Sequence, residues 1–195
     1  MPTNNTDNPR LRHGGGHRVK DHQAIHLVHR GVCVIEELEK RIGHRFQNAN
    51  ILREAVIHTF EEGHVERGAR SNTRLAWLGD TVVNLCVSED LYRLLERFDR
   101  AVLDRARQDI VNEDTLALAA RSLELDRFLT SSRGAPIPED QMSTGTLEKA
   151  FEAIVGAVYL DGGASAAWAL VRKSLGSDQA SSFDSFGRYI GQPGQ

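Results

Sequence analysis

Two stretches of this sequence, residues 73–98 and 144–160, combine dense aliphatic residues at helical spacing with an internal glycine. The first is too apolar for a surface helix with one solvent-exposed face, so we expect it to run through the core of a domain. Gly79 and Gly156 lie inside these helices, where a glycine costs about 1 kcal/mol relative to alanine. A glycine that is present in spite of this cost indicates a place where a second backbone comes close. The sequence therefore predicts that the helices cross at their glycines.

An acidic residue lies near each of these glycines. Asp80 follows Gly79 directly, and Glu152 precedes Gly156 by about one helical turn. A crossing at the glycines would bring the two carboxylates close together among apolar neighbours. A buried carboxylate is costly unless it is paired or binds a cation. The residues alone therefore leave two alternatives open, a divalent-metal site and a buried polar pair.

The other periodic segments are also helical, and no stretch alternates apolar and polar residues as a half-buried strand does. Glycines at 43 and 162–163 interrupt the pattern, and Asn112 is a candidate N-cap. We therefore expect an all-α domain of about six to eight helices. Besides the two central stretches, the predicted helices lie near residues 34–42, 48–56, 101–110, 113–123 and 164–175.

Charge and composition divide the chain into three parts. Residues 1–30 carry five basic and two acidic side chains, whereas the other 165 residues carry 19 basic and 25 acidic ones. We expect a flexible basic arm rich in His, Gly and Arg at 1–30, a domain at 31–175 and a C-terminal tail at 176–195. The tail is either a loosely ordered end or a short docking segment. Its large apolar residues are Phe183, Phe186, Tyr189 and Ile190.

Several classes of protein are disfavoured by composition. An acidic body is not the evenly positive surface of a dedicated nucleic-acid binder. No apolar run approaches the ~20 residues of a membrane span, and the first residues lack the apolar core of a secretory signal. Two cysteines, Cys33 and Cys86, are too few for a disulfide framework. We expect an intracellular protein without a membrane partner, its compartment among cytoplasm, nucleus and mitochondrion left open.

Two motifs resemble those of the ribonuclease III catalytic domain. Residues 72–80 read Asn-Thr-Arg-Leu-Ala-Trp-Leu-Gly-Asp, and residues 147–161 contain Glu-Ala-Ile-Val-Gly-Ala-Val-Tyr-Leu-Asp. The resemblance extends from about residue 32 to 175. It implies an all-α, ribonuclease III-type endonuclease bundle, a homodimer, and cleavage of double-stranded RNA with Mg²⁺ or Mn²⁺ held by carboxylates. Too few residues follow 175 for the RNA-binding module that many members append, so we expect a divergent member without it.

The sequence departs from the family at the metal site. Of the acidic positions that the resemblance implies, Asp80 and Glu152 are kept. Thr73, Ala76 and Lys149 stand where the family has acids, and two of its four metal ligands, at Ala76 and Lys149, are lost. An ammonium at Lys149 opposes a metal by its charge as well as by the missing oxygen.

Two hypotheses address these losses. Glu148 shares a helix face with Glu152 and is a possible substitute for the missing acid. Its displacement by one residue, however, rotates the side chain by about 100° around the helix axis. In the other hypothesis, Lys149 replaces the metal charge and pairs with Asp80 and Glu152.

Trp77 occupies the position of the hallmark's aromatic residue. The resemblance implies that this residue projects from one subunit into an apolar socket of the partner, a role that suits a large rigid side chain. The alternative is an ordinary core tryptophan. We expect Trp77 to be the dimer anchor.

Three functions remain in competition. The leading hypothesis is a pseudoenzyme: a ribonuclease III-fold homodimer with a degenerate metal site and weak or no nuclease activity, associated with RNA processing or a ribonucleoprotein. The first alternative is a small active double-stranded RNA endoribonuclease with a rearranged site, which alone would need Mg²⁺ or Mn²⁺ at Asp80 and Glu152. The second alternative is a dimeric scaffold without an RNA role.

Overall fold

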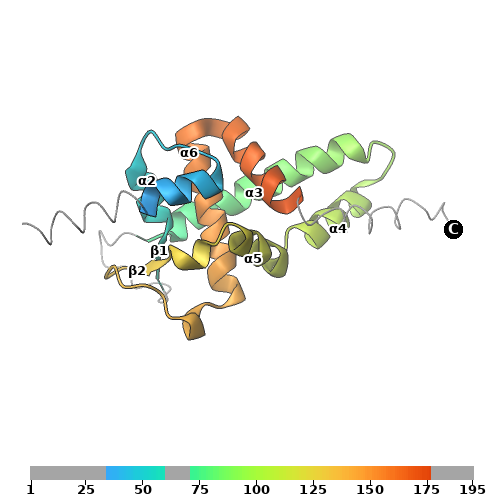
Figure 1. The fold of residues 1–195 in the computed structure, drawn as a ribbon. Helices are drawn as coiled ribbons and strands as arrows, with labels where there is room; N and C mark the ends of the chain where they lie inside the picture. The colour runs from blue at the N-terminus through green and yellow to red at the C-terminus, as the bar shows by residue number, and fades with distance from the viewer. Residues whose placement is uncertain (1–33, 60–70, 177–195) are drawn as a thin grey trace, which may run out of the picture.

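The computed structural model describes residues 34–59 and 71–176, which form the all-α bundle expected from the periodicity (Figure 1). The predicted basic arm and C-terminal tail lie outside these residues. A first helix covers residues 34–42. The further elements are α2 (Ala49–Ala55), β1 (Ile57–His58), α3 (Thr73–Leu94), α4 (Arg100–Ile110), α5 (Glu113–Ser122), β2 (Thr130–Ser131) and α6 (Thr144–Gly176), with short 3₁₀ turns at Leu125–Arg127 and Glu139–Gln141.

Helix α6 forms the centre of the bundle. It packs along α3 and α5 and also contacts α2, as Figure 1 shows. Phe151, the largest fully buried side chain described, lies in its first half. Gly163 has φ 74° and ψ −174°, a backbone conformation that divides α6 into two helical segments at a kink. The break predicted at residues 162–163 is therefore confirmed.

By length and composition alone, α6 is also apolar enough to cross a membrane, and it is the one described helix of which this is true. Its apolar side chains, however, are largely buried against α3 and α5. The helix thus supplies the core of this domain.

The two central helices cross at their glycines, as predicted. A Cβ atom placed on Gly79 would lie 1.7 Å from the carbonyl oxygen of Glu152. One placed on Gly156 would lie 2.3 Å from the carbonyl oxygen of Leu75. No side chain of any size fits between these backbones, so both positions require glycine.

Local signals place most helix ends where the sequence predicts them. The side chains of Asn48 and Asn112 accept hydrogen bonds from backbone N–H groups in the first turns of α2 and α5. Gly43, with φ 81°, ends the first helix. Helix α3 ends at Leu94 rather than at 98, because the chain turns and Asp99 then caps α4.

Two local features differ from what the sequence suggests. Helix α3 is not buried along its whole length, since Leu85, Tyr92 and Leu94 are exposed. The aliphatic residues of α3 thus lie on two faces of the helix, one in the core and one exposed. The second difference is a two-residue parallel pair, in which Ile57 of β1 faces Thr130 of β2. Strands of two residues are too short to produce a recognisable alternation of apolar and polar residues in the sequence.

The crossing yields a prediction about stability. Replacing Gly79 with alanine should lower the free energy of unfolding by about 3 kcal/mol or more, since the added methyl meets backbone that cannot move aside. Urea denaturation measures the loss. Gly145→Ala is the matched control, because its Cβ would lie 3.4 Å from the Glu113 carboxylate, an ordinary contact. A Gly79→Ala protein within about 1 kcal/mol of the parent would contradict a tight crossing.

Candidate functional site

The structure places the two retained carboxylates on the crossing helices, but it does not bury both. Asp80 on α3 is exposed, which corrects the expectation of a buried residue among apolar neighbours. Its Oδ1 accepts a hydrogen bond of 2.8 Å from Nδ2 of Asn84, one turn further along the helix. Glu152 on α6 is half-buried. Packing of α3 on α6 turns Asp80 outward from the crossing and leaves Glu152 partly covered by it.

Glu152 has the most perturbed carboxyl group of the site. Its pKa is raised to about 8, chiefly by burial and then by the neighbouring charges of Glu148 and Asp80, while the charge of Lys149 acts in the opposite direction. Because the charge of Asp80 acts on Glu152, the crossing brings the two acids within electrostatic range of each other. Near neutral pH, the uncharged form of Glu152 predominates.

Two further carboxylates belong to the same site. Burial raises the pKa of Glu148, and the charges of Glu113 and Asp80 raise it as well. Glu113 begins α5, and its carboxylate lies against the first turn of α6, near Gly145. Together these side chains form what we call the carboxylate–lysine cluster: Asp80, Glu113, Glu148, Lys149 and Glu152.

Lys149 is the cation of this cluster. Its charge lowers the pKa of both Glu148 and Glu152. It also lowers the pKa of His58, a buried residue of β1, although burial is the larger cause of that shift. The charge of Lys149 therefore acts on two glutamates of its own helix, α6, and on a histidine of β1.

The other substituted positions supply no carboxylate. Thr73 is exposed and accepts a hydrogen bond of 3.1 Å from the Ser71 hydroxyl, while Ala76 is buried. Within residues 34–59 and 71–176, no three His, Cys, Asp or Glu side chains are arranged so that they could hold a metal ion. The site therefore consists of acids whose charges act on one another and of the one ammonium of Lys149.

Trp77 lies on the surface, with 77% of its area exposed, which excludes the core tryptophan. It shares a side of α3 with Leu85 and Tyr92, within about 80° of arc at 100° per residue. These three exposed residues are called the α3 stripe. Exposed aromatic residues in such an array are typical of a protein–protein interface.

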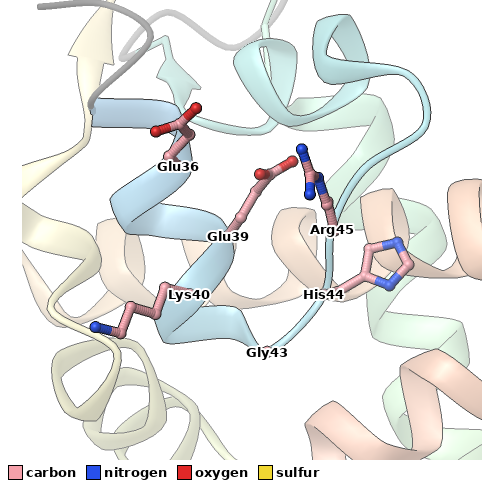
Figure 2. Close-up of a pocket in the computed structure, with 6 residues that line it drawn as sticks. All are labelled: Glu36, Glu39, Lys40, Gly43, His44 and Arg45. Carbon is pink, nitrogen blue, oxygen red and sulfur yellow. The ribbon is translucent and has the colours of Figure 1, made fainter.

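The hollow shown in Figure 2 lies elsewhere, between the first helix and the turn that follows it. No member of the carboxylate–lysine cluster lines it. Beside it, Asp161 of α6 accepts hydrogen bonds from the backbone of Gln47 and Asn48 and from His44 Nε2. Burial opposes this charge, but the three donors lower the pKa of Asp161 below its usual value. Asp161 thus anchors the turn to α6.

Sequence reasoning missed three members of the neighbourhood. Asn84 was detectable in principle, because it follows Asp80 by four residues and so shares its helix face. Glu113 and His58 carry no such signal. They reach the site only through tertiary packing, which places α5 against α6 and β1 beside β2 and α2.

Comparisons with known proteins agree with this geometry. A family described as Ribonuclease-III-like matches residues 48–178. Ribonuclease 3 of Nitratidesulfovibrio vulgaris is 37% identical over 142 residues, which cover 73% of this chain and 56% of that protein. Ribonuclease 3 of Desulfotalea psychrophila is 34% identical over 147 residues, or 75% and 61% of the two lengths. The chain thus spans 56–61% of these relatives.

A solved structure shares the fold. The nuclease domain of ribonuclease III from Campylobacter jejuni is 28% identical, with a TM-score of 0.64, over 74% of this chain and 97% of that one. That structure is described as showing structural flexibility in a region involved in dimer formation of the nuclease domain.

The raised pKa of Glu152 predicts a specific pH dependence of stability. Below pH 4.5 the carboxyl group is protonated in both states; between pH 4.5 and about 8 only the unfolded chain releases the proton. Stability should therefore fall as the pH rises through this window. Glu152→Gln should weaken this decline and raise the melting temperature near pH 8 by several degrees, at about 2–4 °C per kcal/mol. Melting curves in EDTA measure it; parallel profiles for both proteins would contradict it.

Proposed function

Since the chain belongs to the Ribonuclease-III-like family, we propose that it is a homodimeric RNA-associated factor in which Lys149 takes the place of a metal ion. Its nuclease activity is weak or absent, and its role lies in RNA processing or in a ribonucleoprotein. The observation that carries this proposal is the position of Lys149 within the carboxylate–lysine cluster, where its charge acts on both Glu148 and Glu152.

Two physical arguments support a lysine in the role of the cation. The charges of Glu113 and Asp80 raise the pKa of Glu148, and those of Glu148 and Asp80 raise the pKa of Glu152, so these acids repel one another and a positive charge among them is favourable. An ammonium tethered to α6 supplies that charge permanently, whereas a metal ion must be recruited from solution. It also competes with any ion for the oxygens of Glu148 and Glu152.

The residues present do not fit Mg²⁺. The ion requires six oxygen ligands in near-octahedral geometry, usually from one or two carboxylates and several waters. Here Ala76 provides no oxygen, and Lys149 provides a positive charge. We therefore assign this chain no metal-dependent step.

One observation favours the active alternative. Glu148 lies close enough to Asp80 and Glu113 for their charges to raise its pKa, so a third carboxylate is present beside the two retained ones. If that carboxylate and Lys149 rearranged, a metal-dependent endoribonuclease would result. The same assay distinguishes the two functions.

The test is incubation of the chain with long double-stranded RNA and Mg²⁺ or Mn²⁺, followed by a denaturing gel. We expect no cleavage above that of an Asp80→Asn control, because Ala76 and Lys149 supply no oxygen where the family resemblance implies metal ligands. Metal-dependent cleavage that disappears in Asp80→Asn or Glu152→Gln would establish the active alternative instead. A gel shift with the same RNA separates an RNA-associated factor from a scaffold without an RNA role.

The double variant Ala76→Glu/Lys149→Asp restores the four acidic positions of the family. It should gain thermal stability on addition of Mg²⁺, by RT ln(1 + [L]/Kd), which is about 2.7 kcal/mol at 100 Kd. The parent chain is the control and should show no such gain. An equal Mg²⁺ response in the parent would contradict the assignment of Lys149 as the resident cation.

The dimer rests on the α3 stripe, which begins one turn before Asp80. Leaving Trp77, Leu85 and Tyr92 in water is unfavourable, and burying them against a partner would recover this free energy. The position of Trp77, three residues before Asp80, would couple the interface to the carboxylate–lysine cluster.

For Trp77→Ala we expect a loss of about 2–4 kcal/mol of association free energy, because a central buried tryptophan is a frequent hot spot. Sedimentation equilibrium at micromolar concentration measures the monomer–dimer constant. Leu118→Ala, which removes an exposed leucine from α5, serves as the control and should leave that constant nearly unchanged. An unmutated chain that is monomeric at this concentration would refute the dimer.

A further inference from the structure

An apolar groove lies between the C-terminal halves of α3 and α6, on the part of the molecule where α4 ends. Its volume is about 220 Å³. For comparison, an apolar cavity of about 150 Å³ takes up a benzene molecule. The groove therefore has room for an aromatic ring. Its apolar walls come from three helices and consist of Val87, Leu91, Leu94, Ile110, Val171 and Leu175.

The polar groups at the groove already have partners. Arg172 of α6 donates two hydrogen bonds, of 2.9 and 2.6 Å, to the carboxylate of Asp90 on α3. Nearby, Trp168 Nε1 donates a bond of 2.6 Å to Glu89. These bonds fasten the second half of α6 to α3 beside the groove. Since its polar groups are satisfied, the groove selects an apolar occupant.

One wall of the groove is incomplete. Leu94 lines this apolar groove, and yet 60% of its area is exposed. Gly176, the last residue described, also lines the groove, so the chain continues into residues 177–195 directly from its edge. The next segment of the polypeptide is thus already beside the site.

The sequence of that segment matches the groove. Residues 177–195 contain three of the twelve aromatic residues of the chain, an unusual share for a polar, Gly-rich end. Phe183, Phe186 and Ile190 are spaced i, i+3 and i+7, as on one face of an amphipathic helix. Phe183 lies seven residues beyond Gly176, so an extended linker of about 23 Å lets it reach any point of the groove.

We propose that the groove is the docking site of the chain's own segment 177–190, with Phe183 and Phe186 as the anchoring side chains. Tethering favours this occupant over a separate one. A short flexible linker gives an effective concentration in the millimolar range, so even a weak intrinsic affinity fills the groove. The anchors cover Leu94 and complete the core between α3 and α6.

Hydrogen exchange of the full chain tests this proposal. If the intrinsic Kd is about ten times below the effective concentration, the amides of 183–190 should exchange about tenfold more slowly than an unstructured peptide. Leu94→Arg places a charge on the groove wall at a largely exposed position and should abolish that protection. The matched control is Leu118→Arg, which alters an equally exposed leucine on α5 and should preserve it.

A second variant and a dilution series complete the test. In Phe183→Ser/Phe186→Ser, the groove should bind an added synthetic peptide of residues 177–195, with shifts in the NMR signals of the Val87 and Val171 methyl groups. The native chain should bind that peptide far more weakly. Protection that depends on protein concentration would assign the groove to a second copy instead. Exchange at the unstructured rate, or protection unchanged by Leu94→Arg, would overturn the proposal.

Discussion

The contact of Gly79 with Gly156 is the constraint on which the rest of this structure depends. Because no Cβ separates the backbones, α3 and α6 approach at their peptide groups rather than at side chains. Such an approach leaves almost no freedom in the position of the crossing along either helix. Residues within one turn of the glycines, among them Asp80 and Glu152, are therefore placed by the backbone itself.

The same crossing brings the two acids of the cluster that flank it into electrostatic range of each other. Asp80 and Glu152 lie together because the helices cross there, whether or not an ion is present. In the function proposed above, the ammonium of Lys149 offsets part of the negative charge of these acids, so that the cluster needs no metal ion for its charge balance.

The kink at Gly163 has a comparable influence on the other end of the molecule. It redirects the second half of α6 along α3, where Trp168 and Arg172 bind acidic residues of that helix. The apolar groove lies beside this fastening. Helix α3 consequently serves three surfaces: the crossing, the exposed stripe that begins with Trp77, and the groove. Because α3 contributes to three surfaces, it carries many aliphatic residues. From the sequence alone, all of these residues are expected in the core.

The sequence by itself determined the helices, their caps and the crossing, because periodicity, the side chains of Asn48 and Asn112, and the cost of a helical glycine are local properties. The two motifs likewise predicted the family, which the match over residues 48–178 confirms. Only the tertiary structure decided that Asp80 and Trp77 face outward while Ala76 faces inward, since the rotation of α3 about its axis depends on its packing against α6. It also brought Glu113 and His58 to the site. Their positions depend on how α5 and β1 pack, and that is a property of the whole chain rather than of any segment within it.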